Sequence, residues 1–461
     1  MSYAQPGKRQ KVREAKTAEN VDYFQGIDKI EYNNMASATD TTNFRYYNST
    51  ERVHSRNMED WLKYSVSLTE FRNNGSDSQG RPTLNRSWDD NSHTLDNYKR
   101  YIKAFYDFCT KLGIKYWTAF DTDLVPPTDN WEENKTNWDD IVECVNELNQ
   151  RCQVKLLWIA PDLHSHPRYA SGAFTSNEAT TFVQAATQIK KCLEVSQRLN
   201  AECFLLWPYR EGYDAIFQAD VAREIKLFAK LLKITAEYKD RLNYRCQLLI
   251  MPYSGNFGSN YSSYNSVPWR HSSWGDMLNR YMWDLTSCLY FLKCHNLDRF
   301  YKVCTPPGHH MYMASVYNMF GGVTITNKFD LSDVKTITLM MKCIVDQGGA
   351  PPGGINLKLP SRRDSDLRDL VTMYVKCMDA LAKGLRAACS VVTEQVFVKH
   401  LQQRYASYYS GFGSRLVSAD VTIEECEEFY KKNQLHNEPT CSKPEHYHVV
   451  FQRYLDTCEH I

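Results

Sequence analysis

Side chains that could do acid–base or metal chemistry follow several short apolar runs in the first half of this sequence. They are Asp121, Asp123, Asp162, His164, Arg210 and Glu211. Carboxylates and imidazoles can act as general acids and bases or bind a divalent cation. The same groups could instead pair with Arg168, Arg210 and Lys358 in a structural polar network. We favour the structural interpretation, because ion pairing is the usual fate of partly buried charges.

The positions after the later apolar runs carry few groups suited to a hard cation. They are Met251, Tyr253, Pro306, His309, Thr324, Thr326 and Lys358. Two divalent cations need about six ligands each, mostly oxygens from several strands. Because no carboxylate is in this set, the sequence predicts no two-metal centre. Adjacent residues rarely face the same point, so at most one of His309 and His310 should point inward.

Four aromatic residues, Trp158, Trp207, Tyr209 and Tyr253, lie in or after these runs. They could form a platform for a sugar ring, or they could fill the interior of the fold. We favour packing.

The elements that position these residues alternate regularly from residue 60 onward, with short apolar runs followed by longer amphipathic stretches. Strands are expected at Tyr64–Thr69, Lys115–Phe120, Val154–Ala160, Cys203–Tyr209, Gln247–Tyr253, Phe300–Thr305, Gly321–Thr326 and Gly353–Leu359. Helices between them include Asn97–Leu112, Glu178–Leu199, Asp220–Tyr238 and Asp276–Cys294. Eight units predict a closed (β/α)8 TIM barrel. An open doubly wound sheet shares the alternation, but no GxGxxG turn follows the first strand.

Three regions are expected along the chain. Residues 1–22 form a flexible basic tail, 23–363 the barrel with an N-terminal extension, and 364–461 a C-terminal helical arm. Arm helices are expected at Asp366–Val391, Glu394–Tyr409 and Ile423–Lys432, either packed outside the barrel or reaching a neighbouring subunit. The stretch Ser254–Ser273, rich in Ser, Asn, Gly and Tyr, is typical of an enlarged loop beside the pocket.

Composition narrows the class of protein. The 461 residues include 55 Lys+Arg and 54 Asp+Glu, so no net field would concentrate nucleic acid. Fifteen scattered cysteines without a CxxC pair favour reduced thiols. No apolar run is long enough to span a membrane. We expect a soluble intracellular protein, with the cytoplasm as the first choice and an organelle as the alternative.

Motifs in the same order along nearly the whole chain carry a family resemblance. They are Phe24–Ile30, Phe44–Asn48, Lys115–Pro126, Leu157-Trp158, His166–Arg168, Arg210–Tyr213, Gly353–Asn356, Arg362-Arg363, Met378-Asp379 and Arg404–Tyr408. From about residue 23 to the C-terminus, the chain resembles xylose isomerases of the longer type. The resemblance implies a barrel that interconverts aldoses and ketoses with two magnesium, manganese or cobalt ions.

The resemblance also implies that the family's functional residues are replaced here. The ring-opening His corresponds to Phe120, although its aspartate partner is kept as Asp121. The polarising Lys corresponds to Tyr253. The ligand positions correspond to Met251, Pro306, Thr324 and Lys358, with only His309 retained, and a further Asp-x-Asp pair falls in a deletion between Asn327 and Ser332. We therefore expect no catalytic residues of the family type and no metal cofactor. The Lys358 ammonium could offset the acidic wall where a dication sat.

Three functions remain open. The leading hypothesis is a non-catalytic pseudoenzyme that acts as a structural, scaffolding or oligomerising subunit, in a homo-oligomer or with other proteins, through an arm whose Arg404–Tyr408 motif is intact. The second is a carbohydrate-binding or sensing protein. The third is an isomerase of the family's intramolecular oxidoreductase type with an altered, metal-poor site. The residual pocket would hold Asp121, Asp123, Trp158, Arg210, Glu211, His309 and Lys358.

Overall fold

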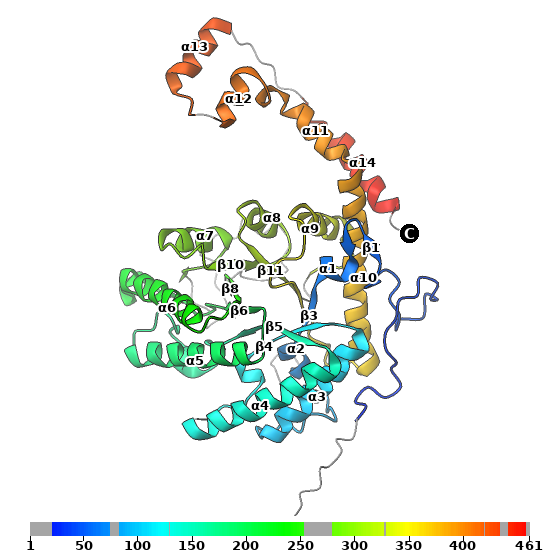
Figure 1. Ribbon diagram of the computed structural model, residues 1–461, viewed down its shortest axis with the longest axis vertical. Coiled ribbons are helices and arrows are strands. Elements are labelled where there is room, and N and C mark those ends of the chain that lie inside the picture. Colours follow the sequence, from blue (N-terminus) through cyan, green and yellow to red (C-terminus); the bar gives the residue numbers. More distant parts are fainter. Residues whose placement is uncertain are drawn as a thin grey trace, which may run out of the picture.

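A closed parallel barrel forms the centre of the computed structural model, and a helical arm extends from it (Figure 1). The structure describes residues 21–73, 83–128, 130–252, 279–326, 329–418, 420–433 and 441–457. The expected loop Ser254–Ser273, Tyr253 and nearly all of the basic tail lie outside the described residues. Among the described helices, none is both long and apolar enough to cross a lipid bilayer.

The barrel strands are all parallel to their neighbours. They are β3 (Tyr64–Ser67), β4 (Tyr116–Phe120), β5 (Lys155–Ala160), β6 (Cys203–Leu206), β8 (Gln247–Ile250), β10 (Tyr301–Thr305), β11 (Phe320–Thr326) and β12 (Ile355–Lys358). They follow one another around the barrel in sequence order, and β12 pairs with β3 to close it. Each of the eight strands expected from sequence is confirmed, with ends shifted by up to three residues.

The helical layer covers the outside of the barrel. It comprises α1 (Met58–Leu62), α2 (Leu68–Arg72), α3 (Leu95–Leu112), α4 (Trp131–Cys152), α5 (Ala179–Arg198), α6 (Val221–Arg241), α7 (Leu285–Cys294), α8 (His309–Val316), α9 (Val334–Asp346) and α10 (Leu367–Glu394). Helix α3 shows how the sequence sets these limits. The Thr94 side chain accepts a hydrogen bond from the Asn97 N–H at its start, and Gly113 ends it at φ +67°.

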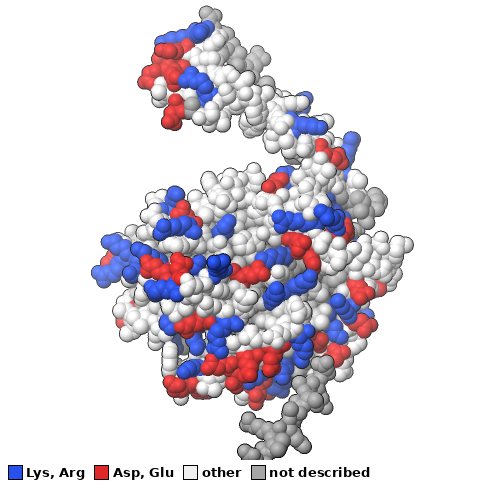
Figure 2. All heavy atoms as spheres, in the orientation of Figure 1, with Lys and Arg blue, Asp and Glu red and all other residues white. Residues whose placement is uncertain are grey.

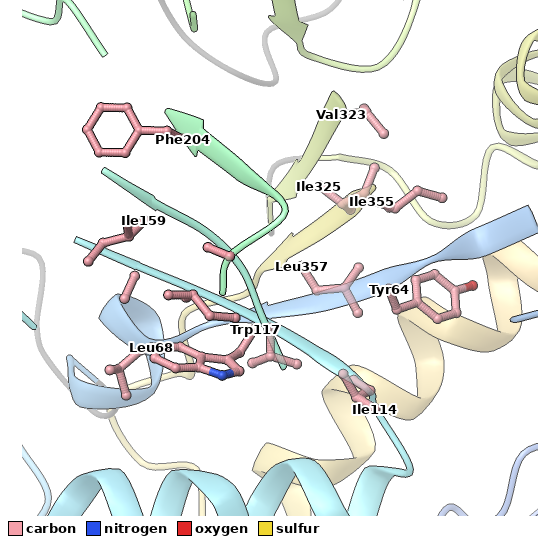
Figure 3. Close-up of a cluster of buried hydrophobic side chains, with 14 of the residues drawn as sticks. Tyr64, Leu68, Ile114, Trp117, Ile159, Phe204, Val323, Ile325, Ile355 and Leu357 are labelled. Atoms are coloured by element: carbon pink, nitrogen blue, oxygen red, sulfur yellow. The ribbon is translucent and has the colours of Figure 1, made fainter. Parts of the chain in front are cut away.

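Two apolar layers result from the alternation of side chains along each strand. Outward-facing residues such as Trp117, Ile159 and Leu357 pack under the helices in the large core that Figure 3 shows. Inward-facing residues fill the barrel as a smaller cluster. It consists of Phe120, Leu157, Trp158, Ala160, Cys203, Leu205, Leu249 and Cys304. The barrel interior is therefore packed with side chains, as this fold requires.

The prediction of a helix over Asp276–Cys294 is wrong for residues 279–284, and residues 276–278 lie outside the described ranges. Residues Asn279–Arg280 form β9, which pairs antiparallel with β7 (Gly212–Tyr213), and helix α7 begins only at Leu285. Asp284 sets this start, because its carboxylate accepts the Ser287 N–H. The residues before Asp284 have helical periodicity, but pairing of β9 with β7 determines their structure instead.

The C-terminal helices divide into a packed part and an extended part. Helix α10 lies along α9 and buries residues such as Leu370, Tyr374 and Leu381. Beyond it follow α11 (Val396–Arg404), the short η5 (Ala406–Tyr408), α12 (Gly411–Ser418) and α13 (Ile423–Asn433), which bury no residue. Helix α14 (Pro444–Thr457) returns to α10 through Phe451 and Leu455. The division of the chain at residue 364 stays a prediction.

Candidate functional site

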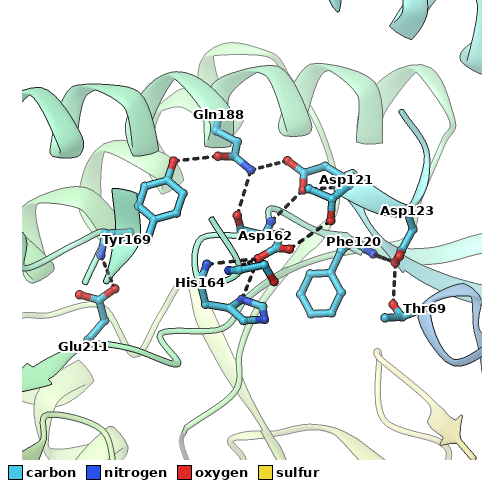
Figure 4. Close-up of polar contacts among 12 residues, drawn as sticks. Thr69, Phe120, Asp121, Asp123, Asp162, His164, Tyr169, Gln188 and Glu211 are labelled. Atoms are coloured by element: carbon cyan, nitrogen blue, oxygen red, sulfur yellow. Dashed lines mark hydrogen bonds and ion pairs between the residues drawn. The ribbon is translucent and has the colours of Figure 1, made fainter. Parts of the chain in front are cut away.

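The carboxyl ends of the parallel strands meet at one mouth of the barrel, where such folds carry their chemistry. A short 3₁₀ turn, η1 (Asp121–Asp123), directly follows β4 and carries two of the expected carboxylates. Asp162 follows β5, and Glu211 follows β6. Figure 4 shows how these groups lie relative to one another.

Asp121 is buried and held by three hydrogen-bond donors (Figure 4). Its Oδ1 accepts the backbone N–H groups of Asp162 and Thr122, at 2.8 and 2.9 Å, and its Oδ2 accepts the Gln188 amide at 2.8 Å. Burial raises the pKa of this carboxyl to about 7 in spite of these donors. Asp121 therefore joins two strand-end loops and α5.

Asp123 is also enclosed on its own side of the mouth. Its Oδ2 accepts the Thr69 hydroxyl at 2.6 Å and the Phe120 N–H at 2.9 Å. Burial raises the pKa of Asp123. Asp123 therefore links the end of β4 to helix α2, which follows β3.

Asp162 differs from the other carboxylates because an imidazole lies beside it. Its Oδ1 accepts the backbone N–H groups of Ser165 and His164, and Oδ2 accepts the Thr122 hydroxyl. Nδ1 of His164 lies 3.0 Å from Oδ1, in a contact too bent for a straight hydrogen bond. Burial would raise the pKa of Asp162, but His164 and the N–H donors outweigh it and lower the pKa.

Glu211 is 1% exposed and receives four donors from one loop. Its carboxylate accepts the backbone N–H groups of Ala173, Phe174 and Thr175 and the Thr175 hydroxyl, at 2.7 to 3.1 Å. Gly172 allows the loop to lie this close to the Glu211 carboxylate. It has φ +87°, and a Cβ there would lie 2.7 Å from the Glu211 carboxylate. Burial raises the pKa of Glu211.

The aromatic residues separate into packing and mouth positions. Trp158 is 5% exposed inside the barrel cluster, as the packing interpretation predicts. At the mouth, the His164 ring contacts Trp207, Phe120 and Tyr209, with centroids 4.8 to 5.4 Å apart. Sequence reasoning weighed His164 but did not join it to these rings, which come from the ends of β4 and β6.

The second half of the mouth, where β8, β10, β11 and β12 end, carries side chains of other types. Met251 and Pro306 are half-buried and Thr324 is buried. Lys358 Nζ lies 3.4 Å from the Glu70 carboxylate and 5.6 Å from the centroid of the Trp207 ring. His309, the first residue of α8, is exposed, and His310 is half-buried.

The predicted cationic partners of the carboxylates are wrong in part. Backbone and neutral donors hold Asp121 and Glu211, where the sequence suggested Arg168, Arg210 and Lys358. Arg168 is exposed and bonds to the His166 ring, while Lys358 lies against Glu70. Arg210 is half-buried near His164, whose pKa it helps to lower. A loop N–H satisfies a buried carboxylate without the cost of desolvating a second charge.

A two-ion centre does not fit these residues. The carboxylate oxygens of Asp121, Asp123 and Glu211 already accept the hydrogen bonds described above. In the second half, Met251, Pro306, Thr324 and Lys358 offer thioether, proline, hydroxyl and ammonium groups, and His309 is exposed. Within the described ranges, no three His, Cys, Asp or Glu side chains group as metal ligands would. Gln188, Thr69 and Thr175 support the site and were not foreseen, because nothing in their sequence surroundings marks them.

Relatives similar in sequence over most of this chain are named xylose isomerase. No protein-family model matches the chain. The xylose isomerase of Caldicellulosiruptor bescii is 32% identical over 88% of this chain and 93% of its own length. That of Arabidopsis thaliana is 30% identical over 94% and 90%. A xylose isomerase-like TIM barrel protein from Mycobacterium smegmatis, in complex with magnesium, overlays at TM-score 0.43 with 10% identity. The overlay covers 72% of this chain and 99% of that one. Through the first two relatives, the chain belongs to the xylose isomerase family.

Proposed function

We propose that this protein does not catalyse metal-dependent sugar isomerisation and serves as a structural, oligomerising subunit built on the isomerase barrel. The observation that supports it best is the composition of the second half of the mouth. Met251, Pro306, Thr324 and Lys358 occupy the positions where the family's ligands are expected, and none of them offers a carboxylate.

The first half of the mouth does not supply the missing ligands. Asp121 and Glu211 use their oxygens to fix loops, and burial raises the pKa of both, which disfavours the charged forms that a cation needs. Binding an ion there would require breaking several hydrogen bonds to backbone N–H groups. The residues present are thus suited to holding the fold together.

The extended part of the arm supports the second half of the proposal. No residue of helices α11 to α13 is fully buried, yet these helices expose large apolar side chains. These include Val398, Leu401, Tyr405, Leu416, Val417 and Ile423. Figure 2 shows that much of the surface over α11 and α12 is neither basic nor acidic. Exposed apolar surface on this scale is typical of protein–protein contacts.

The first test joins elemental analysis to an activity assay. We expect the purified chain to contain no stoichiometric divalent metal and to form no xylulose from xylose with added magnesium, manganese or cobalt. The xylose isomerase of C. bescii, prepared and assayed in parallel, is the positive control. Stoichiometric metal together with turnover would show that other residues complete the centre and would overturn the proposal.

The second test concerns the arm. We expect the wild-type chain to sediment as an oligomer and the double variant Leu401→Glu, Val417→Glu to sediment as a smaller species with an unchanged circular dichroism spectrum. Gln402→Glu adds a charge to the same helix at a position that is already polar, and it should leave the size unchanged. A wild-type chain that is monomeric at micromolar concentration would refute the oligomerising role.

A further inference from the structure

We propose that a hollow between helices α4 and α5 binds a mononucleotide, with the base against Trp131 and the phosphate between Lys135 and Lys191. The two helices pack beside each other in the outer layer of the barrel (Figure 1). The site shares none of the residues described at the mouth, so the inference goes beyond the proposed function and does not depend on it.

The hollow measures about 260 Å³ and is lined by one row of side chains from each helix. Residues three and four positions apart lie on the same face of a helix. The lining residues are Trp131, Asn134 and Lys135 from α4 and Thr187, Lys190, Lys191 and Glu194 from α5. Because small-molecule sites usually measure about 300–1,000 Å³, a ligand here would stay partly in solvent.

Trp131 gives this hollow an aromatic surface. The residue is 65% exposed, whereas Trp138, two turns further along the same helix, is 3% exposed. Among the residues that the structure describes, no other aromatic ring packs against Trp131. An exposed indole without a ring partner is a surface on which a nucleobase can stack.

The net charge of the hollow comes from two of its three lysines. Lys190 Nζ lies 2.5 Å from Oε1 of Glu194, and the Tyr238 hydroxyl donates to the same oxygen at 2.6 Å. Lys190 and Glu194 therefore neutralise each other. Lys135 and Lys191 are the remaining charged groups of the lining.

Lys135 and Lys191 approach the hollow from different helices. Neither forms an ion pair within the part of the chain that the structure describes. One anion that both act on is Asp139, whose pKa is lowered by a hydrogen bond from Arg198 and by the charges of the two lysines. Because Arg198 already pairs with this carboxylate, the two ammonium groups stay available to a ligand. A phosphate monoester, with close to two negative charges at neutral pH, matches them.

The charges of the chain favour a free nucleotide over a nucleic acid. Lys+Arg and Asp+Glu are nearly equal in number, 55 and 54, so no net positive field would hold a polyanion. Glu132 and Glu133, both exposed, follow Trp131 directly and would repel the flanking phosphates of a polynucleotide. Two cations and one stacking surface are therefore suited to a single base that carries its own phosphate.

The test is a calorimetric titration of the purified chain with AMP, in the presence of EDTA and at low salt. We expect saturable binding with a Kd below about 1 mM. Added salt should weaken it, because exposed charges are screened. Adenosine lacks the phosphate and ribose 5-phosphate lacks the base, so each should bind at least about tenfold more weakly than AMP.

Substitutions separate the two contacts. Trp131→Ala should weaken AMP binding about 5- to 150-fold, the range that base stacking supplies. The double variant Lys135→Met, Lys191→Met should weaken it at least about tenfold and remove most of the salt dependence. Trp283→Ala and Lys230→Met change an exposed tryptophan and an exposed lysine outside the hollow, and both should bind AMP as the wild type does. Circular dichroism spectra verify that all variants are folded.

Three results would overturn the inference. They are no saturable binding of AMP by the wild type, equal affinity for AMP and ribose 5-phosphate, and wild-type affinity in both Trp131→Ala and the double lysine variant. Tighter binding of a single-stranded oligonucleotide than of AMP would assign the surface to nucleic acid and would also contradict it. Metal content and xylulose formation are measured separately, so failure of the proposed function would appear there and not in the AMP titration.

Discussion

The two halves of the barrel mouth differ in what their side chains do for the fold. In the first half, the carboxylates of Asp121, Asp123 and Glu211 accept hydrogen bonds that hold strand-end loops in place. In the second half, Met251, Pro306 and Thr324 hold no loop through a charged group. A carboxylate that satisfies buried N–H groups is costly to remove even where no reaction depends on it. A buried acidic residue at the mouth can therefore be important for stability alone.

Among substitutions that test this difference between the two halves, the largest loss of stability is expected at Glu211. Glu211→Ala removes the acceptor for three backbone N–H groups and one hydroxyl, so we expect the free energy of unfolding to fall by about 3–5 kcal/mol. Urea unfolding followed by tryptophan fluorescence measures it. A loss under about 1 kcal/mol would show that water or other groups replace the carboxylate.

Lys358→Met in the second half is the matched control for that measurement. Its ammonium pairs with Glu70 at 3.4 Å and is partly exposed, so we expect a loss of at most about 1 kcal/mol. An effect as large as that of Glu211→Ala would mean that the Lys358 charge offsets the acidic wall, and the contrast between the two halves would fail.

A different kind of effect, visible as a pH dependence, is expected at Asp121. Burial raises its pKa to about 7 in the folded chain, while the unfolded chain titrates near 3.9. Between these values the folded state holds a proton that the unfolded state has lost, so this group makes stability fall as pH rises from about 4 to 7, by about 1.4 kcal/mol per unit of pKa difference.

Asp121→Asn should remove that component. From pH 5 to pH 7, the unfolding free energy of the variant should therefore fall less, or rise more, than that of the wild type. Asp28→Asn, at an exposed position, is the control and should follow the wild type. Identical pH profiles for Asp121→Asn and the wild type would place the pKa of Asp121 in its ordinary range.

The barrel was predictable because its signals are local and repeated. Each strand is an apolar run, and each helix has its own periodicity and cap, as Thr94 and Gly113 show for α3. The assignment of Met251, Pro306, Thr324 and Lys358 to the family's ligand positions comes from collinear motifs and stays a prediction. Position along a strand is enough to bring such a residue to the mouth.

The partners of the carboxylates were not predictable in the same way. Gln188 lies 67 residues from Asp121, in the middle of an ordinary amphipathic helix, and the backbone N–H groups that hold Glu211 carry no sequence signal. Choosing Arg168 as a partner relied on charge alone. Cationic side chains can be recognised in a sequence. Backbone N–H donors depend on loop conformation, which the residue types alone do not specify.

Helix α10 has a mechanical consequence. Its 28 residues make a rod about 42 Å long. Near its middle, the Asp379 carboxylate accepts the backbone N–H groups of residues 45, 46 and 47, and Arg386 pairs with Glu51. Its far end carries the extended helices (Figure 1). A force applied to the arm would therefore be transmitted along a stiff lever to the N-terminal extension, where a pull would be opposed by these contacts before it reached the strands.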